Sequence, residues 1–193
     1  MASKTFLLFR RSLWLTILKL LFLGFVAAML AIQIPNWLYD LGPAKPLAID
    51  SPEALKRFQP RRSTFVSVKG EPDFERAFSY ARYGLTYTYF NIRPFGMGIV
   101  VRTHRSVDED WKELNRFLGR LRPFGHQPFS YRIRAIYRDK FQTEVPERAY
   151  FLALDEVPRM TGWKIGASAF ALVLWMVMFY FFFLWGRRRR RAG

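Results

Sequence analysis

The sequence predicts a two-pass membrane protein, in which two transmembrane helices bracket a small extramembrane α+β domain, an OB-like β-barrel with one or two helices. Three observations support this fold class. Apolar segments of helical length lie near both ends of the 193-residue chain. The region between them holds short β-prone runs separated by Pro and Gly. All 15 acidic residues lie between Asp40 and Glu156, so both ends carry only positive charge.

The composition excludes several classes of protein. The chain has 31 Lys and Arg residues against 15 Asp and Glu, which gives a formal net charge of +16, and it has no cysteine. A chain without cysteine cannot form a disulfide scaffold, perform thiol catalysis, or bind a metal or an iron–sulfur cluster through thiolates.

The clearest transmembrane prediction covers residues 163–186. Its 21 residues from Ile165 to Trp185 carry no charge, and a helix of that length spans roughly 30 Å, the thickness of a hydrocarbon core. Trp163 and Trp185 lie at its ends, where aromatic rings favour the headgroup region. The alternative, a buried helix of a soluble protein, would need a larger domain to cover it on all sides.

A first transmembrane helix is predicted for residues 13–34, with Pro35 ending it. Its uninterrupted apolar run, Leu20 to Ile32, has the length of a signal-peptide core, but the whole apolar stretch is longer than such a core. Lys19 lies near the helix end, so we expect its ammonium group to reach the interface. The other interpretation is that Lys19 pairs with a carboxylate of a partner.

Basic residues predict the orientation. Residues 1–12 contain Lys4, Arg10 and Arg11, and residues 187–193 form an Arg-rich tail. By the positive-inside rule both termini are cytoplasmic, and the domain at 36–162 is periplasmic or lumenal, in an inner, cytoplasmic-type membrane. The tail is interpreted as a stop-transfer anchor that attracts anionic lipids, although such runs also occur in nucleic-acid-binding tails. The expected lipid and topology anchors are Lys19, Trp163, Trp185, Arg187, Arg188, Arg189, Arg190 and Arg191.

The central region is expected to contain five strands, at 64–69, 85–93, 99–104, 129–138 and 149–155. The fourth was chosen because apolar and polar residues alternate along it. Helices are expected at 72–83, from helical spacing of apolar residues, and at 106–122. In the second helix Ser106 and Glu109 form a capping box, and Trp111 and Leu114 begin the apolar face.

This architecture resembles the Surfeit-locus family of cytochrome oxidase assembly proteins, in which two membrane helices also bracket a β-rich domain. In that family an apolar strand leads into an Asn-Arg-Gly-Trp signature after a short hairpin. Here the matching stretch reads Ile99-Val100-Val101-Arg102-Thr103-His104-Arg105, without that signature. The resemblance implies a role in assembly of a membrane oxidase, and no site residue follows from it.

Few residues suggest catalysis or a cofactor. The two histidines, His104 and His126, lie outside both predicted spans, so neither span offers the usual axial ligand to haem. The acidic run Asp108–Asp110 could bind a hard cation, but acidic residues also favour the first turn of a helix. We therefore expect a protein that is not an enzyme and has no cofactor and no metal site.

Two surfaces are expected to bind partners. The first is one face of the strand at 129–138, formed by Arg132, Arg134 and Arg138. The second is an aromatic ridge on the second span, formed by Trp175, Phe179, Phe182 and Phe183. A solvated strand face and lipid-facing aromatics are the alternatives. The expected function is a non-catalytic accessory or structural subunit of a larger respiratory or photosynthetic membrane complex. Other membrane-protein subunits and anionic lipids are the expected partners, pigments are contacted by packing alone, and nucleic acid is excluded by the compartment. The alternatives are a transient assembly factor for an oxidase-type complex and a membrane-anchored enzyme.

Overall fold

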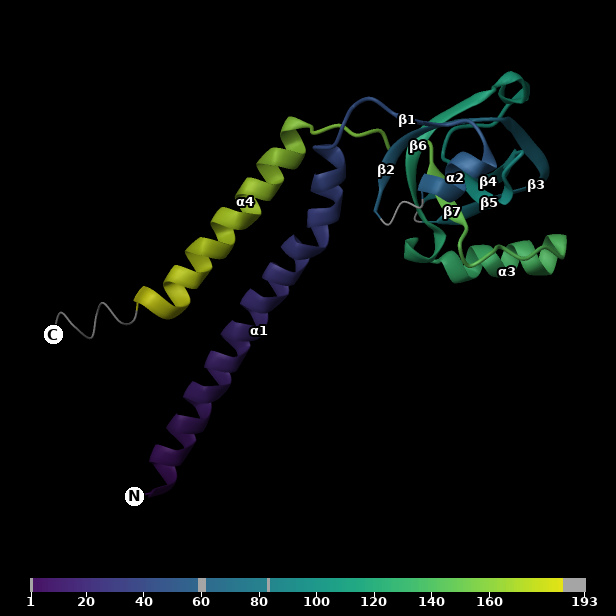
Figure 1. Cartoon of the computed structure of the whole chain (residues 1–193). Helices are drawn as coiled ribbons and strands as arrows, with labels where there is room; N and C mark the ends of the chain where they lie inside the picture. The colour runs from purple at the N-terminus through teal and green to yellow at the C-terminus, as the bar shows by residue number, and fades with distance from the viewer. Residues whose placement is uncertain (1, 59–61, 83, 186–193) are drawn as a thin grey trace. The chain divides into compact units, whose positions relative to one another are not determined.

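The computed structural model describes residues 2–58, 62–82 and 84–185, with the backbone alone for residues 2–13. The chain forms two units. Met1–Trp37 and Met160–Gly193 make up a helical unit, and Leu38–Arg159 make up a second unit, called the sheet domain below. Figure 1 shows the course of the chain through both.

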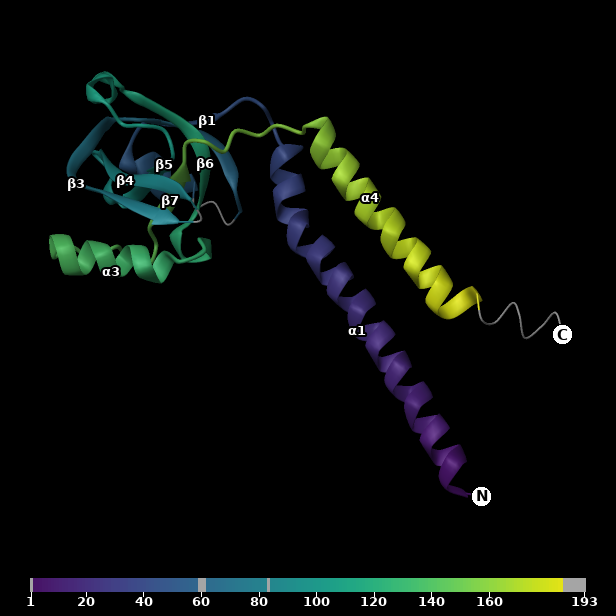
Figure 2. The ribbon, with the colours of Figure 1, turned by 180° about the vertical axis from the view of Figure 1, so that it is seen from behind.

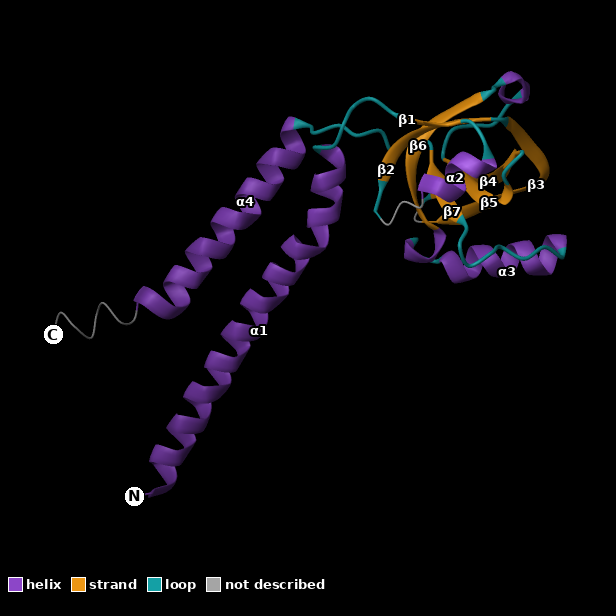
Figure 3. Cartoon of the chain, viewed as in Figure 1, coloured by secondary structure: helices purple, strands orange, loops and turns teal. Residues whose placement is uncertain are grey.

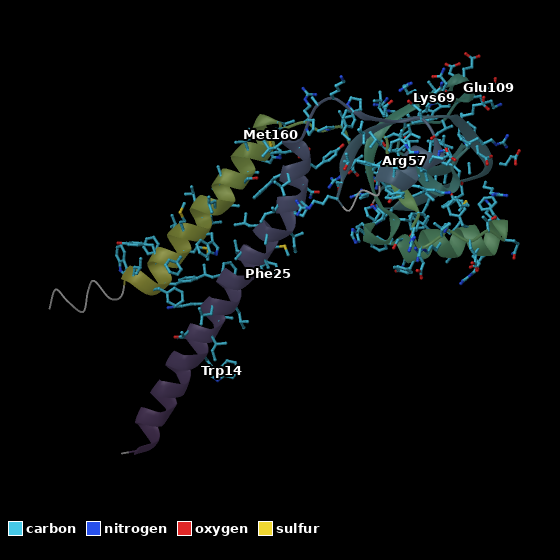
Figure 4. The ribbon with its side chains drawn as sticks, viewed as in Figure 1. Trp14, Phe25, Arg57, Lys69, Glu109 and Met160 are labelled. Atoms are coloured by element: carbon cyan, nitrogen blue, oxygen red, sulfur yellow. The ribbon has the colours of Figure 1, made fainter. Side chains whose placement is uncertain are left out.

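The helical unit consists of α1 (Ala2–Asp40) and α4 (Gly162–Phe179), which continues as a π-helical turn at Tyr180–Leu184. Within them, Trp14–Asp40 and Gly162–Leu184 are long and apolar enough to cross a membrane. Large apolar side chains project from both helices, as the labelled Trp14 and Phe25 illustrate on α1 (Figure 4). The expected stop at Pro35 was wrong, because α1 continues to Asp40. A proline removes one backbone hydrogen bond, and apolar helices tolerate this loss.

The sheet domain is built on a mixed seven-stranded sheet in the order β1-β2-β6-β7-β5-β4-β3. β1 pairs with β2, and β5 with β7, in parallel, and the other neighbours are antiparallel. β1 and β3 are the two edges of the sheet, so a closed barrel is not shown. The strands are β1 (Leu47–Ile49), β2 (Thr64–Lys69), β3 (Glu71–Arg82), β4 (Leu85–Arg93), β5 (Gly96–Thr103), β6 (Arg116–Pro123) and β7 (Tyr150–Ala153).

Both faces of this sheet carry a hydrophobic core. The strands curl around the short helix α2 (Pro52–Phe58), and its Leu55 joins Val66, Phe90 and Leu121 in the first cluster (Figure 3). On the opposite face, α3 (Ser130–Phe141) runs along the sheet, as Figure 2 shows from behind. There, Phe78, Phe124, Ile133, Tyr137 and Phe151 form the second cluster. The predicted strands at 64–69, 85–93, 99–104 and 149–155 are confirmed as β2, β4, β5 and β7.

The helix expected at 72–83 was wrong, because this segment is strand β3. The pairing of β3 with β4 shifts register between Asp73 and Phe78. As a result Phe74 packs against the first cluster, whereas Phe78 belongs to the second. The irregularity moves the side chains from one face to the other, and this change of phase imitated the spacing of a helix.

The capped helix expected at 106–122 was also wrong. Its first part is a single 3₁₀ turn, Glu109–Glu113, and its second part is strand β6. Trp111 packs from that turn against the first cluster, with its ring 6.1 Å from that of Phe90, while Leu114 is exposed. Gly119 lies in the middle of β6, where a helix would be weakened by about 1 kcal/mol relative to alanine.

The strand expected at 129–138 was wrong, because this segment forms helix α3. The predicted arginine face depended on that strand. Ile133 and Tyr137, four residues apart, are the buried positions of α3. Polar and apolar residues do alternate along this segment, but the segment is a helix. In a helix Ile133 and Tyr137 share one face, and that face packs against the apolar face of the sheet.

Candidate functional site

Three arginines of the sheet domain converge on one carboxylate. Arg102 of β5 and Arg120 and Arg122 of β6 point to Glu156, which follows β7. Arg102 Nη2 and Arg122 Nη2 donate to Glu156 Oε1 at 2.7 and 3.0 Å, and Arg120 Nη1 donates to Oε2 at 3.2 Å. The register explains the convergence, because Arg102 and Arg120 both lie opposite the small Ala153 of the intervening strand. We call these four residues the arginine–glutamate cluster.

The cluster is largely buried and rich in guanidinium groups. The arginine side chains are 9–16% exposed and that of Glu156 is 28% exposed. Arg102 and Arg122 both pair with the same carboxylate oxygen, Glu156 Oε1. Burial lowers the pKa of Arg122, the charges of Arg120 and Arg102 lower it further, and Glu156 opposes the effect. The buried Nε–H groups of Arg102 and Arg122 donate no hydrogen bond to any described residue. The arrangement is therefore suited to binding a further anion.

Two residues support the cluster from either side. Gly119 of β6 is required by close packing, because a Cβ there would lie 3.0 Å from Leu154 Cα and closer still to the backbone of Ala153. Tyr39, in the last turn of α1, donates from its hydroxyl to the carbonyl oxygen of Glu156 at 2.7 Å. The Arg120 guanidinium lies 4.4 Å from the centroid of the Tyr39 ring, a cation–π contact.

An apolar groove adjoins the cluster at Tyr39. It has a volume of about 720 Å³ and lies beside the edge strand β1. Phe65, which is the cross-strand neighbour of Arg120, also lines it. The remaining lining residues are Leu38, Gly42, Pro43, Lys45, Pro46, Leu47, Ala48, Phe58, Ser63 and Thr64. A guanidinium cluster and an apolar groove thus share one wall.

A second arginine-rich surface lies at the start of α3, and we call it the arginine–tyrosine patch: Tyr80, Arg82, Phe129, Tyr131 and Arg132. Arg132 donates from Nη1 to the Tyr80 hydroxyl at 3.1 Å and from Nε to the Tyr131 hydroxyl at 3.0 Å. The Arg82 guanidinium lies 3.5 Å from the centroid of the Phe129 ring. Tyr131 is 63% exposed, so the patch offers ordered aromatic and guanidinium groups at the surface.

The other two predicted arginines of this segment lie elsewhere on α3. Arg134 stacks 5.4 Å from the centroid of the Phe124 ring, and its Nε atom is buried. Arg138 is exposed and pairs with Asp139 at 2.9 Å. Because the segment is helical, Arg132, Arg134 and Arg138 do not share a strand face.

The predicted aromatic ridge lies mostly on one face of the second helix. Trp175, Phe179 and Phe183, spaced four residues apart, line a groove together with Leu23 and other small and apolar residues of α1. Trp175 Nε1 donates to the Leu23 carbonyl oxygen at 3.1 Å. Consecutive rings of the ridge are 5.7 and 5.5 Å apart. Part of the ridge is thus used for contact within the helical unit.

The predicted anchors are found in different surroundings. Lys19 Nζ lies 5.6 Å from the centroid of the Phe182 ring, so its described contact is aromatic. Trp163 is 82% exposed, and Trp185 stacks on Phe181 at 5.1 Å. Arg187, Arg188, Arg189, Arg190 and Arg191 lie outside the described residues.

Of the two histidines, His104 has a carboxylate partner among the described residues. Its Nδ1 lies 2.7 Å from Asp155 Oδ2, and its backbone N–H donates to the same oxygen at 2.8 Å. The adjacent Thr103 donates from its hydroxyl to Asp155 Oδ1 at 3.4 Å. Within the described ranges, no three His, Asp or Glu residues are grouped closely enough to hold a metal ion.

The chain was compared with known proteins at the level of sequence and of structure. No family model, curated protein or solved structure matches it. The Surfeit-family resemblance therefore remains a hypothesis based on the order of helices and strands.

The sequence interpretation missed the arginine–glutamate cluster. Arg120 and Arg122 were assigned to a helix, on which residues two apart face different directions. On a strand, residues two apart share a face, so the signal was present in their spacing. Glu156 could not be identified beforehand, because its role depends on where the chain turns after β7.

Proposed function

We propose that this protein is a non-catalytic accessory subunit of a larger membrane complex, respiratory or photosynthetic. The two apolar helices anchor it in an inner, cytoplasmic-type membrane, with both termini in the cytoplasm and the sheet domain on the periplasmic or lumenal side. The sheet domain then contacts another subunit of the complex through the arginine–tyrosine patch.

The composition and order of the patch are the observation that supports this proposal. Arginine and tyrosine are enriched at the energetic centres of protein interfaces, because they combine large contact area with directional hydrogen bonds. Arg132 is already held by the hydroxyls of Tyr80 and Tyr131, so little side-chain entropy would be lost on binding. Residues 36–162 contain 21 Lys and Arg residues against 15 Asp and Glu, and this net charge of +6 favours an acidic partner surface.

Co-purification from membranes in mild detergent tests the proposal. The double variant Tyr131→Ala/Arg132→Glu should lose its partner subunits, and the association of the unaltered chain should weaken as salt is raised. Lys140→Glu is the matched control, because it makes the same charge reversal at an exposed position of the same helix. Retention of all partners by the double variant would contradict the proposal.

The same experiment addresses the assembly-factor alternative, which rests on the Surfeit-like architecture. An accessory subunit remains in constant stoichiometry with the mature complex. A transient factor would instead be found on incomplete complexes and be absent from the mature one.

A further inference from the structure

We propose that the arginine–glutamate cluster and the adjoining groove form a binding site for one anionic phospholipid. The phosphate group would bind at Arg102, Arg120 and Arg122, and part of an acyl chain would lie in the groove beside β1. The inference relies on the membrane anchoring proposed above, but it concerns a different surface from the arginine–tyrosine patch.

The charge of the cluster favours a bound anion. A buried arginine normally has a carboxylate of its own, since uncompensated charge is costly away from water. Here Arg102 and Arg122 share one oxygen of Glu156, and their buried Nε–H groups have no acceptor among the described residues. A phosphate supplies negative charge and several acceptor oxygens in a geometry that guanidinium groups match.

The groove makes the site amphipathic. Tyr39 contacts Arg120 and Glu156 and also forms part of the groove wall. Phe65 joins the two features from the sheet side, as the cross-strand neighbour of Arg120. A small inorganic anion would use only the cluster. A lipid would occupy both regions, with Tyr39 at the boundary between headgroup and acyl chain.

The covalent chain ties this site to both candidate spans. Tyr39 belongs to the last turn of α1, and only five residues lie between Glu156 and Gly162, where α4 begins. The six steps from one Cα atom to the next reach at most roughly 20 Å when the chain is fully extended. The cluster is therefore held within reach of the headgroup layer once the helices are inserted, and acidic lipids are the anions at highest local concentration there.

Native mass spectrometry of the full chain in neutral detergent tests the site. The probes are phosphatidylglycerol, phosphatidylcholine, diacylglycerol and soluble glycerol phosphate. We expect one tightly bound phosphatidylglycerol, and weaker binding of the other three. Arg102→Gln/Arg122→Gln should weaken phosphatidylglycerol binding at least about tenfold, because hydrogen bonds to a charged group are lost. Arg116→Gln, an exposed arginine at the other end of β6, is the control and should leave affinity unchanged.

Two further variants separate a binding role from a structural one. Glu156→Gln removes the internal competitor, so it should bind phosphatidylglycerol more tightly, whereas a merely damaged domain would bind it less well. Ala48→Trp fills the groove from an exposed position on β1, and it should weaken binding of the lipid but not of glycerol phosphate.

The other outcomes would overturn the lipid site or replace it with another kind of site. Equal binding of phosphatidylglycerol and phosphatidylcholine, or no effect of the double arginine variant, would overturn the proposal. Glycerol phosphate binding as tightly as the lipid would identify a free-phosphate site instead, and an Arg122-dependent acidic peptide that binds while lipids do not would identify a protein-docking site. If the unaltered chain bound no phosphatidylglycerol but retained its partner subunits, this inference alone would be contradicted and the accessory-subunit proposal would stand.

Discussion

Replacing Glu156 with glutamine is expected to destabilise the sheet domain by about 3 kcal/mol. The substitution removes the negative charge that three arginines contact at 2.7–3.2 Å. The side chains of these arginines are only 9–16% exposed, so water cannot replace that charge fully. Removing one partner of a buried ion pair costs about 3–5 kcal/mol. Because Glu156 is 28% exposed, the lower end of that range applies. The glutamine side chain would retain one carbonyl acceptor but could not neutralise any arginine.

The assay is thermal unfolding of the full chain in neutral, lipid-free detergent, followed by near-UV circular dichroism. For a domain of this size, about 3 kcal/mol corresponds to a fall in Tm of roughly 10 °C. Glu144→Gln is the control, because it makes the same chemical change at an exposed position. A shift no larger than that of the control would refute the reasoning that Glu156 neutralises the cluster.

Three further predictions concern the 3₁₀ turn, the buried Tyr137 and the membrane orientation. Trp111→Ala should lower the free energy of unfolding, measured by chemical denaturation, by about 2–3 kcal/mol, which is less than the loss expected for a fully buried ring. Leu114→Ala should leave it nearly unchanged, and equal effects of the two substitutions would contradict the 3₁₀ turn. Burial raises the pKa of Tyr137 above its ordinary value of 10.0, so its contribution to stability is complete below pH 10 and is lost as the pH rises through the folded-state pKa. Burial also raises the pKa values of Tyr89 and Tyr150, so Tyr137→Phe should make the alkaline loss in a stability–pH profile smaller without removing it. An alkaline loss as large as that of the unaltered chain would contradict the assignment. A cysteine at Glu144 should react with an impermeant reagent outside intact cells and a cysteine at Ala2 should not; the reverse pattern would disprove the orientation.

The sequence was sufficient where one physical signal dominated. The uncharged run of the second span and the β-branched and aromatic residues of β4 each favour one structure, and both elements were predicted with nearly correct boundaries. In such segments local preference and tertiary packing agree.

The incorrect assignments share a physical cause, which is that periodicity alone does not show which face becomes buried. The irregularity in β3 moves Phe74 and Phe78 to opposite faces, so a strand acquired helical spacing. In α3, polar–apolar alternation concealed the Ile133 and Tyr137 pair that packs on the sheet. Both outcomes depend on neighbours distant in sequence.

The same limitation applied to the candidate sites. Arg132 was expected on a basic strand face, but it lies on helix α3, and its contact with Tyr80 depends on β3 and α3 lying side by side. The cluster around Glu156 needs three strands in register and the chain turn after β7. No local pattern in the sequence contains that information.

Site-specific photocrosslinking from position 131 in intact cells tests the central claim most directly, since Tyr131 is the most exposed aromatic residue of the arginine–tyrosine patch. A photoreactive phenylalanine analogue replaces Tyr131, and Glu144, at an exposed position beyond α3, carries the control probe. The account predicts that position 131 crosslinks to one subunit of a mature membrane complex and that position 144 does not. Recovery of the chain without any crosslinked partner at position 131, while the complex is present in the same membranes, would contradict it.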